Sequence, residues 1–458
     1  MKKINLFYVG LEKLKSRYTY QLTDWNVREF ERHKKVNSNF SYTIVDADLL
    51  DTNTDITLGQ VLDAYGRPYY ALGQIQTLIR LLKNKSIDKD CVIFFEDMFH
   101  PGVESLFYIL SFLKKEERPR IVMRCLAQTI DPNDFVHQVG MFDWMRKYEE
   151  MVNNFVDYLC IASTDMALHF QIAGWKIPVV VTGLPFGKQE VIERANYEDS
   201  IKGFENRPLK VSFAARTDRE KQPDFFVQVA KETRKMFPGQ KIEFAILSGK
   251  KLSSNDLEIL TCLETAKQDG EITIYEDLSK EDYYAHLKSS RVLFNCALQD
   301  WVSNTASEAD ALGCNLVYPS YRSFPELFLH EHTRMYVPWS VKDAALKVAR
   351  ALCVPHPHIG LISDNMDRTI DKTLSSFYDF YESEKFVPSD ASNFHAESIR
   401  KTNAQARELD RDLSSYFFKT EQQENFWNFS YPPFSAATPL YTRTRSLYYS
   451  PIKFQPLK

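Results

Sequence analysis

The chain has 458 residues, of which 44% are hydrophobic and 26% charged, and its formal net charge is −4. A chain of this length exceeds what one hydrophobic core usually organises, so we expect two domains. The near-balanced charge excludes a strongly basic protein that coats nucleic acid, and the apolar content excludes a disordered chain.

The first half alternates short apolar runs with longer amphipathic stretches, which is typical of repeated βα units. Strands are predicted, in chain order, at 4–9, 42–46, 91–95, 120–125, 158–162 and 178–182. The helices between them include 69–84 and 102–114. Because the strands are continuous apolar runs, we expect them to be buried on both faces of a parallel sheet.

The same alternation returns after a polar stretch, 186–208, that has no clear strand. Strands are predicted at 210–214, 241–247, 271–275, 291–295 and 315–318. Helices are predicted at 222–236, 253–268, 280–289, 303–313 and 340–353. The predicted fold class is α/β, with Rossmann-like domains over 1–190 and 205–355 that bind ligands at the carboxyl ends of their strands.

The remaining residues, 356–458, are predicted to form C-terminal helices and an extended arm. The stretch 390–424 is charged and helix-prone, whereas 425–458 has no acidic residue, four cations and many aromatic residues. We expect this arm to pack back over the body. The alternative is a basic, aromatic arm that contacts a polyanion.

The seven cysteines stand singly, without a CxxC pair, so we expect buried thiols in a reducing compartment and no metal site. No apolar run approaches the roughly 18 residues that span a bilayer. The apolar start of the chain is too short for a signal peptide, and Glu12 and Lys13 follow it directly. We therefore expect a cytoplasmic protein without a transmembrane segment. No feature indicates an oligomeric state.

A first candidate site lies in Val211-Ser-Phe-Ala-Ala-Arg-Thr-Asp-Arg-Glu-Lys221, a strand followed by a loop and a helix. The loop carries Arg216 and Lys221, five residues apart, close to a helix start whose backbone N–H groups also favour anions. This pattern predicts a diphosphate site. A solvated charged loop is the alternative.

A second candidate site begins where the predicted strand 291–295 ends. A short polar loop carries Asp300, and Glu308 follows in a helix that begins near Ser303 and ends at Gly313. Carboxylates can accept hydrogen bonds from the vicinal hydroxyls of a sugar or a ribose. An ordinary helix with acidic residues near its start is the alternative.

Together, the two segments resemble the family 4 glycosyltransferases of the GT-B fold. That family carries Gly-Arg, four residues and Lys after a strand, and later Glu, seven residues and Glu, which Arg216, Lys221, Asp300 and Glu308 match in spacing. Further matches are Ala309 and Gly313, Leu247-Ser-Gly249, and Phe324-Pro-Glu326-Leu. The resemblance covers about 205–330.

The resemblance implies two Rossmann-like domains that face each other across a cleft, and a retaining transfer of sugar from a nucleotide diphosphate sugar. Arg216 and Lys221 would hold the diphosphate, Glu308 the ribose, and the Asp300 loop the sugar. The implied catalytic residues are Arg216, Lys221 and Asp300. The implied donor-binding residues are Arg216, Lys221, Gly249, Asp300, Trp301, Val302, Ser303 and Glu308.

The donor implied by this resemblance is a UDP- or GDP-sugar, bound as a substrate; no tightly bound cofactor and no metal are expected. Two departures leave the sugar open. Asp300 is shorter than the usual Glu, and Trp301-Val302-Ser303 replaces the usual Gly-Phe-Gly.

Strand ends in the first half supply the acceptor-side candidates, which are Gly10, Arg17, Glu96, Asp97, His100, Gln128 and Asp131. For His100, a structural role is the alternative. The segments 95–102 and 128–135 also resemble glycosyltransferases encoded by bacteriophages. This implies a hydroxylated base in phage DNA as the acceptor, and the host cytoplasm as the location.

Two alternatives remain for the function. One is a glycosyltransferase that acts on a glycan or a glycolipid. The other belongs to a different class, a catalytically degenerate GT-B scaffold that binds a partner.

Overall fold

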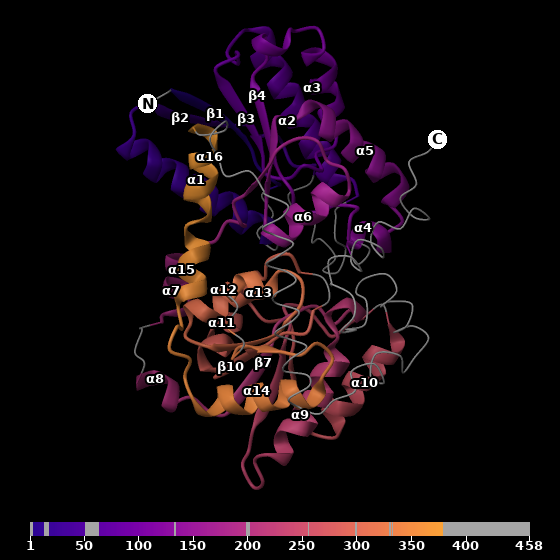
Figure 1. Cartoon of the computed structure of the whole chain (residues 1–458), viewed down its shortest axis with the longest axis vertical. Helices are drawn as coiled ribbons and strands as arrows, with labels where there is room; N and C mark the ends of the chain where they lie inside the picture. Colours follow the sequence, from indigo (N-terminus) through magenta and orange to yellow (C-terminus); the bar gives the residue numbers. More distant parts are fainter. Residues whose placement is uncertain are drawn as a thin grey trace. The chain divides into compact units, whose positions relative to one another are not determined.

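A computed structural model describes residues 3–12, 18–50, 64–131, 134–197, 202–254, 256–297, 300–328, 331 and 333–378. These residues form two compact units (Figure 1). The first contains residues 3–130, 134–186 and 368–378 among them, and the second contains residue 131 and 187–367. The predicted arm 425–458 and the helix-prone stretch before it lie outside the described residues.

The first unit is built on a six-stranded parallel sheet in the order β2-β1-β3-β4-β5-β6. Asn5 of β1, the strand next to the edge, pairs with Ser41 of β2 on one side and Cys91 of β3 on the other. The strands are β1 (Ile4–Val9), β2 (Phe40–Ile44), β3 (Cys91–Phe95), β4 (Arg120–Arg124), β5 (Tyr158–Ile161) and β6 (Val179–Val181).

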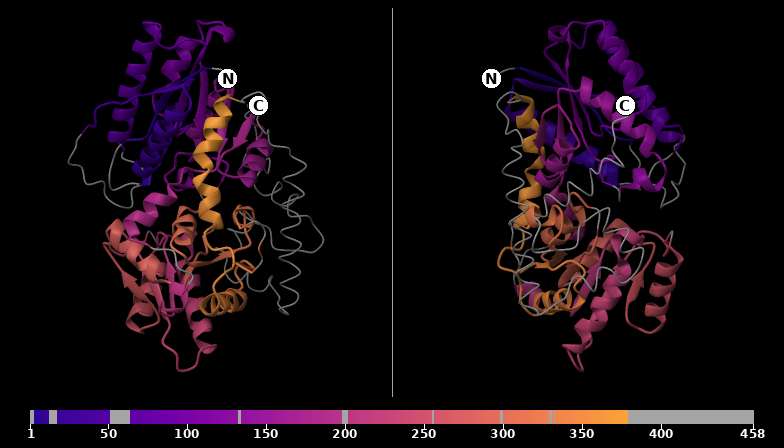
Figure 2. Two further views of the ribbon diagram at one scale, coloured as in Figure 1. Left: turned by 90° about the vertical axis from the view of Figure 1, so that its left-hand side faces the viewer. Right: turned by 45° about the vertical axis from the view of Figure 1, so that its right-hand side comes forward.

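The helices of the first unit come from both ends of the described chain. The last helix, α16, lies against α1 in this unit (Figures 1 and 2). The helices are α1 (Tyr18–Val36), α2 (Gly66–Lys83), α3 (Val103–Leu110), α4 (Phe135–Gln138), α5 (Phe142–Phe155), α6 (Thr164–Ile172) and α16 (Thr369–Tyr378). A 3₁₀ helix, Lys115–Glu117, precedes β4.

Contacts of α16 reach the middle of the first sheet. Phe377 packs edge-on against Phe94 with ring centroids 5.4 Å apart. Arg124 Nη2 donates to Thr373 Oγ1 at 3.0 Å. The C-terminal helix therefore completes the interior of the first unit.

The second unit has its own six-stranded parallel sheet, in the order β12-β11-β10-β7-β8-β9. Its strands are β7 (Lys210–Phe213), β8 (Glu243–Leu247), β9 (Thr273–Tyr275), β10 (Val292–Phe294), β11 (Asn315–Pro319) and β12 (Met335–Tyr336). Its helices are α7 (Lys188–Ala195), α8 (Lys202–Glu205), α9 (Pro223–Lys235), α10 (Leu257–Gln268), α11 (Lys280–Ser289), α12 (Asn304–Ala311), α13 (Phe324–Leu327), α14 (Val341–Cys353) and α15 (Leu361–Asp367).

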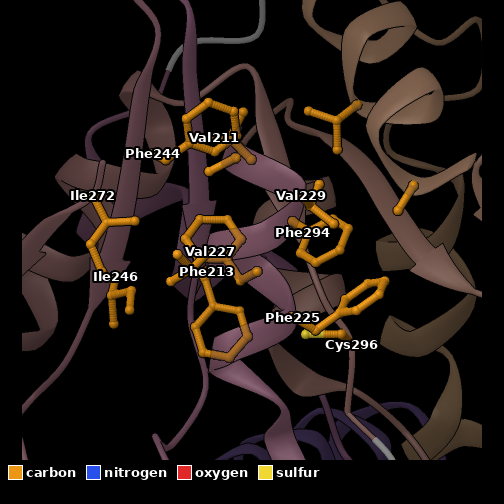
Figure 3. Close-up of a cluster of buried hydrophobic side chains, with 14 of the residues drawn as sticks. Val211, Phe213, Phe225, Val227, Val229, Phe244, Ile246, Ile272, Phe294 and Cys296 are labelled. Carbon is orange, nitrogen blue, oxygen red and sulfur yellow. The ribbon is translucent and has the colours of Figure 1, made fainter. Parts of the chain in front are cut away.

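An aromatic cluster fills the core between this sheet and α9 (Figure 3). Phe213 of β7 and Phe294 of β10 meet Phe225 and Phe226 of α9, with centroids 5.3 to 6.3 Å apart. Burying such a side chain contributes about 1.5–3 kcal/mol. The helix is fixed to the sheet that carries the candidate donor site.

The predicted α/β class with two parallel sheets is confirmed, and the eleven predicted strands lie within two residues of observed ones. The two-residue strand β12 was missed because it is too short to form an apolar run. Helix α10 begins at Leu257 rather than 253 because the Asp256 carboxylate accepts from the N–H groups of Glu258 and Ile259 and so caps the helix there.

The cysteines are free thiols, and five of them are buried as expected. Cys262 is half-buried and Cys353 is exposed, which the sequence prediction did not anticipate. Within the described ranges, no helix is both long and apolar enough to cross a membrane.

Candidate functional site

The loop after β7 carries the two cations predicted to bind a diphosphate. Arg216 donates to the carboxylates of Asp218 and Glu220, both at 2.7 Å, and its side chain is 41% exposed. Lys221 is buried, and its Nζ lies 2.8 Å from Asp300 Oδ1. The two cations therefore lie in one loop, and each is paired with at least one carboxylate.

The start of α9 positions Lys221. This residue ends a 3₁₀ helix, Arg219–Lys221, and Gln222 follows with a φ of 51°. Pro223 is the first residue of α9, where its fixed φ suits a helix and its missing N–H leaves no bond unmade. Lys221 thus lies directly before a helix N-terminus, where the backbone favours an anion.

The loop after β10 brings Asp300 to this cation. The backbone oxygen of Asp300 accepts from Ser323 Oγ at 3.0 Å, which ties the loop to the one after β11. Trp301 is buried, and its ring lies 5.1 Å from the Arg322 guanidinium carbon. The Asp300 carboxylate is therefore held near Lys221 by both its own backbone and its side chain.

Ser303 has a local structural role. Its Oγ accepts from Ala306 N as the N-cap of α12 and lies 3.0 Å from Tyr318 Oη. Val302, the residue before it, is half-buried. The Ser303 hydroxyl, which belongs to the predicted donor segment, therefore caps the helix that carries Glu308.

Glu308 lies inside α12, and donors from α11 surround its carboxylate. Lys280 Nζ and Tyr284 Oη reach Oε1 at 2.7 and 3.1 Å, and Tyr283 Oη reaches Oε2 at 2.9 Å. Burial, together with the charge of Glu308, raises the pKa of Tyr283 well above its usual value, so this phenol stays protonated and donates. These three donors were not predicted from the sequence, although Lys-x-x-Tyr-Tyr at the start of a predicted helix places them on one face.

Gly249 follows β8 in the turn predicted to approach the donor. A Cβ at this position would meet one protein atom within 4 Å, the Leu278 oxygen at 3.7 Å, which is ordinary contact. Protein packing therefore does not require a glycine at Gly249.

Left-handed backbone conformations gather at these loops. Gln222, Arg322 and Trp339 have φ of 51°, 48° and 60°, a region in which side chains are strained. With its amide oriented to satisfy its neighbours, Gln222 accepts from Trp339 Nε1 at 3.1 Å. The Tyr321 ring packs edge-on against Trp339, with centroids 5.5 Å apart. The sequence pattern gave no signal for Arg322 or Trp339.

In the first unit, Glu96 belongs to a fully buried network. It accepts from Arg124 Nη1 at 2.8 Å, from Asn26 Nδ2 at 2.9 Å and from Tyr8 Oη at 3.1 Å. Burial raises the pKa of Glu96 to about 7 despite the neighbouring Arg124. Glu96 is 0% exposed, so its carboxylate is not accessible to an acceptor in this structure.

Asp97, His100 and Gly10 lie together at the carboxyl ends of β1 and β3. Asp97 forms a short ion pair with Arg67, and His100 Nε2 lies 3.1 Å from Gln74 Oε1. Gln74 Nε2 in turn donates to the Gly10 oxygen at 3.0 Å. Burial, together with the charge of Arg67, lowers the pKa of His100 to about 3, so the imidazole is neutral.

The remaining acceptor-side candidates include two residues with other partners, Gln128 and Asp131. Gln128 Nε2 donates to Asp134 Oδ2 at 3.4 Å, and both residues are buried. Asp131 groups with the second unit and accepts from Arg322 Nη2 at 3.1 Å. Arg17 lies outside the described residues.

The buried carboxyl group of Glu149, which contacts Thr129, should make the stability of the protein depend on pH. Burial raises the pKa of Glu149 to about 7, while Thr129 N and Oγ1 donate to it. Because the pKa of Glu149 is higher in the folded protein than in the unfolded one, its protonation contributes to the free energy of unfolding. This contribution is complete below the unfolded pKa of about 4.5 and is lost as the pH rises through about 7. Relative to Glu149→Gln, the natural protein should lose up to about 3 kcal/mol between pH 5 and pH 8.

Chemical denaturation of both proteins across this pH range would measure the difference. Asp143→Asn, which removes an exposed charge from the first turn of the same helix, is the control and should show the pH dependence of the natural protein. A Glu149→Gln variant that follows the natural protein at every pH would contradict the assignment.

No group of three or more His, Cys, Asp or Glu side chains that could hold a metal occurs in the described part of the chain. No protein-family model and no curated protein matches the sequence.

Solved structures do match the fold. A trehalose-6-phosphate protein from E. coli, bound with UDP-2-fluoro glucose, has a TM-score of 0.54 and 13% identity over 83% of this chain and 100% of that one. Sucrose-phosphate synthase from Thermosynechococcus elongatus has a TM-score of 0.52 and 11% identity over 83% and 99%. A putative UDP-N-acetylglucosamine 2-epimerase from Listeria monocytogenes has a TM-score of 0.50 and 12% identity over 83% and 97%. At these identities the likeness establishes the fold, and the chain has the GT-B fold.

Proposed function

We propose that this protein is a retaining glycosyltransferase that takes a UDP- or GDP-sugar as its donor and binds it in the second unit. The observation that carries the proposal is the Lys221–Asp300 pair, which joins the cation loop after β7 to the acidic loop after β10. These are the two segments whose spacing resembles family 4. The GT-B fold, which the E. coli neighbour bound with UDP-2-fluoro glucose shares, supports the proposal.

The diphosphate is the group that Arg216 and Lys221 would hold. In the protein alone these cations are paired with carboxylates, so a bound diphosphate would replace or share those partners. Negative charge grows on the leaving diphosphate as the glycosidic bond breaks, and fixed cations stabilise that charge. In the retaining route that the resemblance implies, the leaving phosphate also takes the acceptor proton.

The rest of the donor would lie along the neighbouring loops. Glu308 would accept from the ribose, and Asp300 with Trp301 would bind the sugar. Gly249, where packing does not require a glycine, would let the backbone approach the nucleotide closely. Val302 and Ser303 would act through the loop backbone, because the Ser303 hydroxyl caps α12.

The acceptor side is proposed for the first unit, at Asp97 and His100, with the buried Glu96 beside Asp97 in the chain. Gly10 and Gln128 would shape the same strand ends. A hydroxylated DNA base is the proposed acceptor, on the sequence resemblance of the segments 95–102 and 128–135 and the basic, aromatic sequence of 425–458. A glycan acceptor is the alternative.

Calorimetry with UDP and GDP tests the donor proposal. Arg216→Ala should weaken binding of the preferred nucleotide about 10- to 100-fold, because a charge-assisted hydrogen bond contributes about 1.5–3 kcal/mol. Arg219→Ala is a matched control, since Arg219 lies three residues on and pairs with Asp256 and Glu258. Unchanged affinity in Arg216→Ala would show that the donor site is misplaced.

Labelled UDP- and GDP-sugars offered with hydroxymethylated DNA, plain DNA and glycans would then identify the acceptor. Label on the modified DNA supports the proposal, and label on a glycan moves the acceptor to that class. If the protein instead epimerises the sugar nucleotide without any acceptor, its reaction is the one named for the Listeria neighbour and not glycosyl transfer. Failure to bind either nucleotide would leave a binding scaffold.

A further inference from the structure

The carboxylate of Glu308 is buried, and most of its hydrogen-bond acceptor positions are occupied by protein donors. It is 4% exposed, and its three hydrogen-bond donors, Lys280, Tyr283 and Tyr284, all come from the first turns of α11. We call these three residues the Glu308 clamp. A carboxylate accepts about four hydrogen bonds, two on each oxygen. Two clamp donors occupy Oε1 and one occupies Oε2, so one acceptor position remains, on Oε2.

Helix stability does not explain why a lysine begins α11. Lys280 is the first residue of that helix, where the backbone dipole disfavours a cation. Ser279 caps the helix, and Glu281 and Asp282 already supply the acidic residues that suit a first turn. The contact with Glu308 at 2.7 Å therefore gives the better reason for a cation at this position.

The two tyrosines hold Lys280 where it can reach Glu308. Its Nζ lies 4.8 Å from the ring centroids of both Tyr283 and Tyr284, within cation–π range. Both hydroxyls donate to the same carboxylate. Orientation of the Glu308 carboxylate is thus fixed from one side by one helix.

We infer that, because of the Glu308 clamp, the Glu308 carboxylate accepts a hydrogen bond from only one ribose hydroxyl of the donor. Lys280 is the residue that positions this carboxylate. The inference rests on the proposed donor site. A carboxylate with both oxygens open could take both vicinal hydroxyls, whereas one open position on Oε2 takes one. The protein should therefore distinguish the two monodeoxy forms of its nucleotide from each other.

Calorimetry with UDP, 2′-deoxy-UDP and 3′-deoxy-UDP tests this, or the guanosine set if GDP is the nucleotide bound. For the natural protein, one deoxy form should bind about 10-fold or more weakly, since a hydrogen bond to a charged group is lost. The other deoxy form should stay within about 3-fold of the parent nucleotide. In Lys280→Met, the ratio of the Kd of the weakened deoxy form to the Kd of the parent nucleotide should fall close to 1. In Lys280→Arg, most of the difference between these two Kd values should return. Lys288→Met, on the same helix but bonded to the Ala195 oxygen, should keep the natural ratio.

The outcomes separate this inference from the proposed function. If the natural protein binds neither UDP nor GDP, the donor site fails and the inference fails with it. If the parent nucleotide binds but both deoxy forms lose affinity equally, Glu308 takes both hydroxyls and only the inference is overturned. It is also overturned if Lys280→Met weakens all three nucleotides alike, because Lys280 would then contact a phosphate rather than orient Glu308.

Discussion

Lys221→Met should lower kcat/KM for the donor by about 10²- to 10³-fold, the size of effect seen when a fixed group that stabilises transition-state charge is removed. Lys221 is buried, whereas the Arg216 side chain is 41% exposed, so water screens Lys221 less. Methionine keeps the apolar stem and its packing beside α9. The Asp300 carboxylate, 24% exposed, can then be hydrated, which limits the cost to folding.

Steady-state release of the nucleotide diphosphate would measure the change, with thermal unfolding as a check on the fold. Lys235→Met is a suitable control because Lys235 lies at the exposed end of α9 and pairs with Glu232. An unaltered kcat/KM in a folded Lys221→Met protein would remove Lys221 from the reaction.

Gly313→Ala should destabilise the second unit by about 2–4 kcal/mol, through a strained backbone and a steric clash. Gly313 ends α12 with a φ of 74°, and a Cβ there would lie 2.2 Å from Tyr197 Oη and 2.8 Å from Arg207 Nη2. The same guanidinium donates to the Leu312 and Gly313 oxygens at the end of α12. Relief of the clash would therefore disturb the cap of the helix that carries Glu308.

Gly270→Ala provides the matched control, since Gly270 has a φ of 70° and no atom within 4 Å of its added Cβ. Gly270→Ala should lower the free energy of unfolding by only about 1–2 kcal/mol, which is the strain of a left-handed backbone at alanine. Urea unfolding of both variants would give the difference. Tyr197→Phe combined with Gly313→Ala should recover part of the loss; equal stability of the two alanine variants would exclude the clash.

The strands could be predicted from the sequence because a buried parallel strand is a continuous apolar run, as in Cys91-Val-Ile-Phe-Phe. The cation and acid loops could be located because they follow such strands at a spacing that matches a known family. What could not be predicted depends on partners far apart in the chain. Glu96 gains Arg124 from the next strand and Asn26 from α1, and no local pattern indicates that it is fully buried.

The Glu308 clamp was missed for the same reason. Lys280 and Tyr283 follow β9, whereas Glu308 follows β10, and only the folded second unit brings these side chains together. The left-handed residues Arg322 and Trp339 were missed because neither is a residue type that usually adopts a positive φ.

The position of α16 sets an order for folding during synthesis. The ribosome makes the strands of the first unit early. The Thr373 hydroxyl that Arg124 bonds and the Phe377 ring that packs on Phe94 are made only after residues 187–367, which carry the described sheet of the second unit. Domains usually fold in the order of their synthesis. Here the described core of the second unit, within 211–352, is made before α16, while the nascent first unit still lacks the partners of Phe94 and Arg124. A stop codon after Asp367 would fix the first unit in that unfinished state.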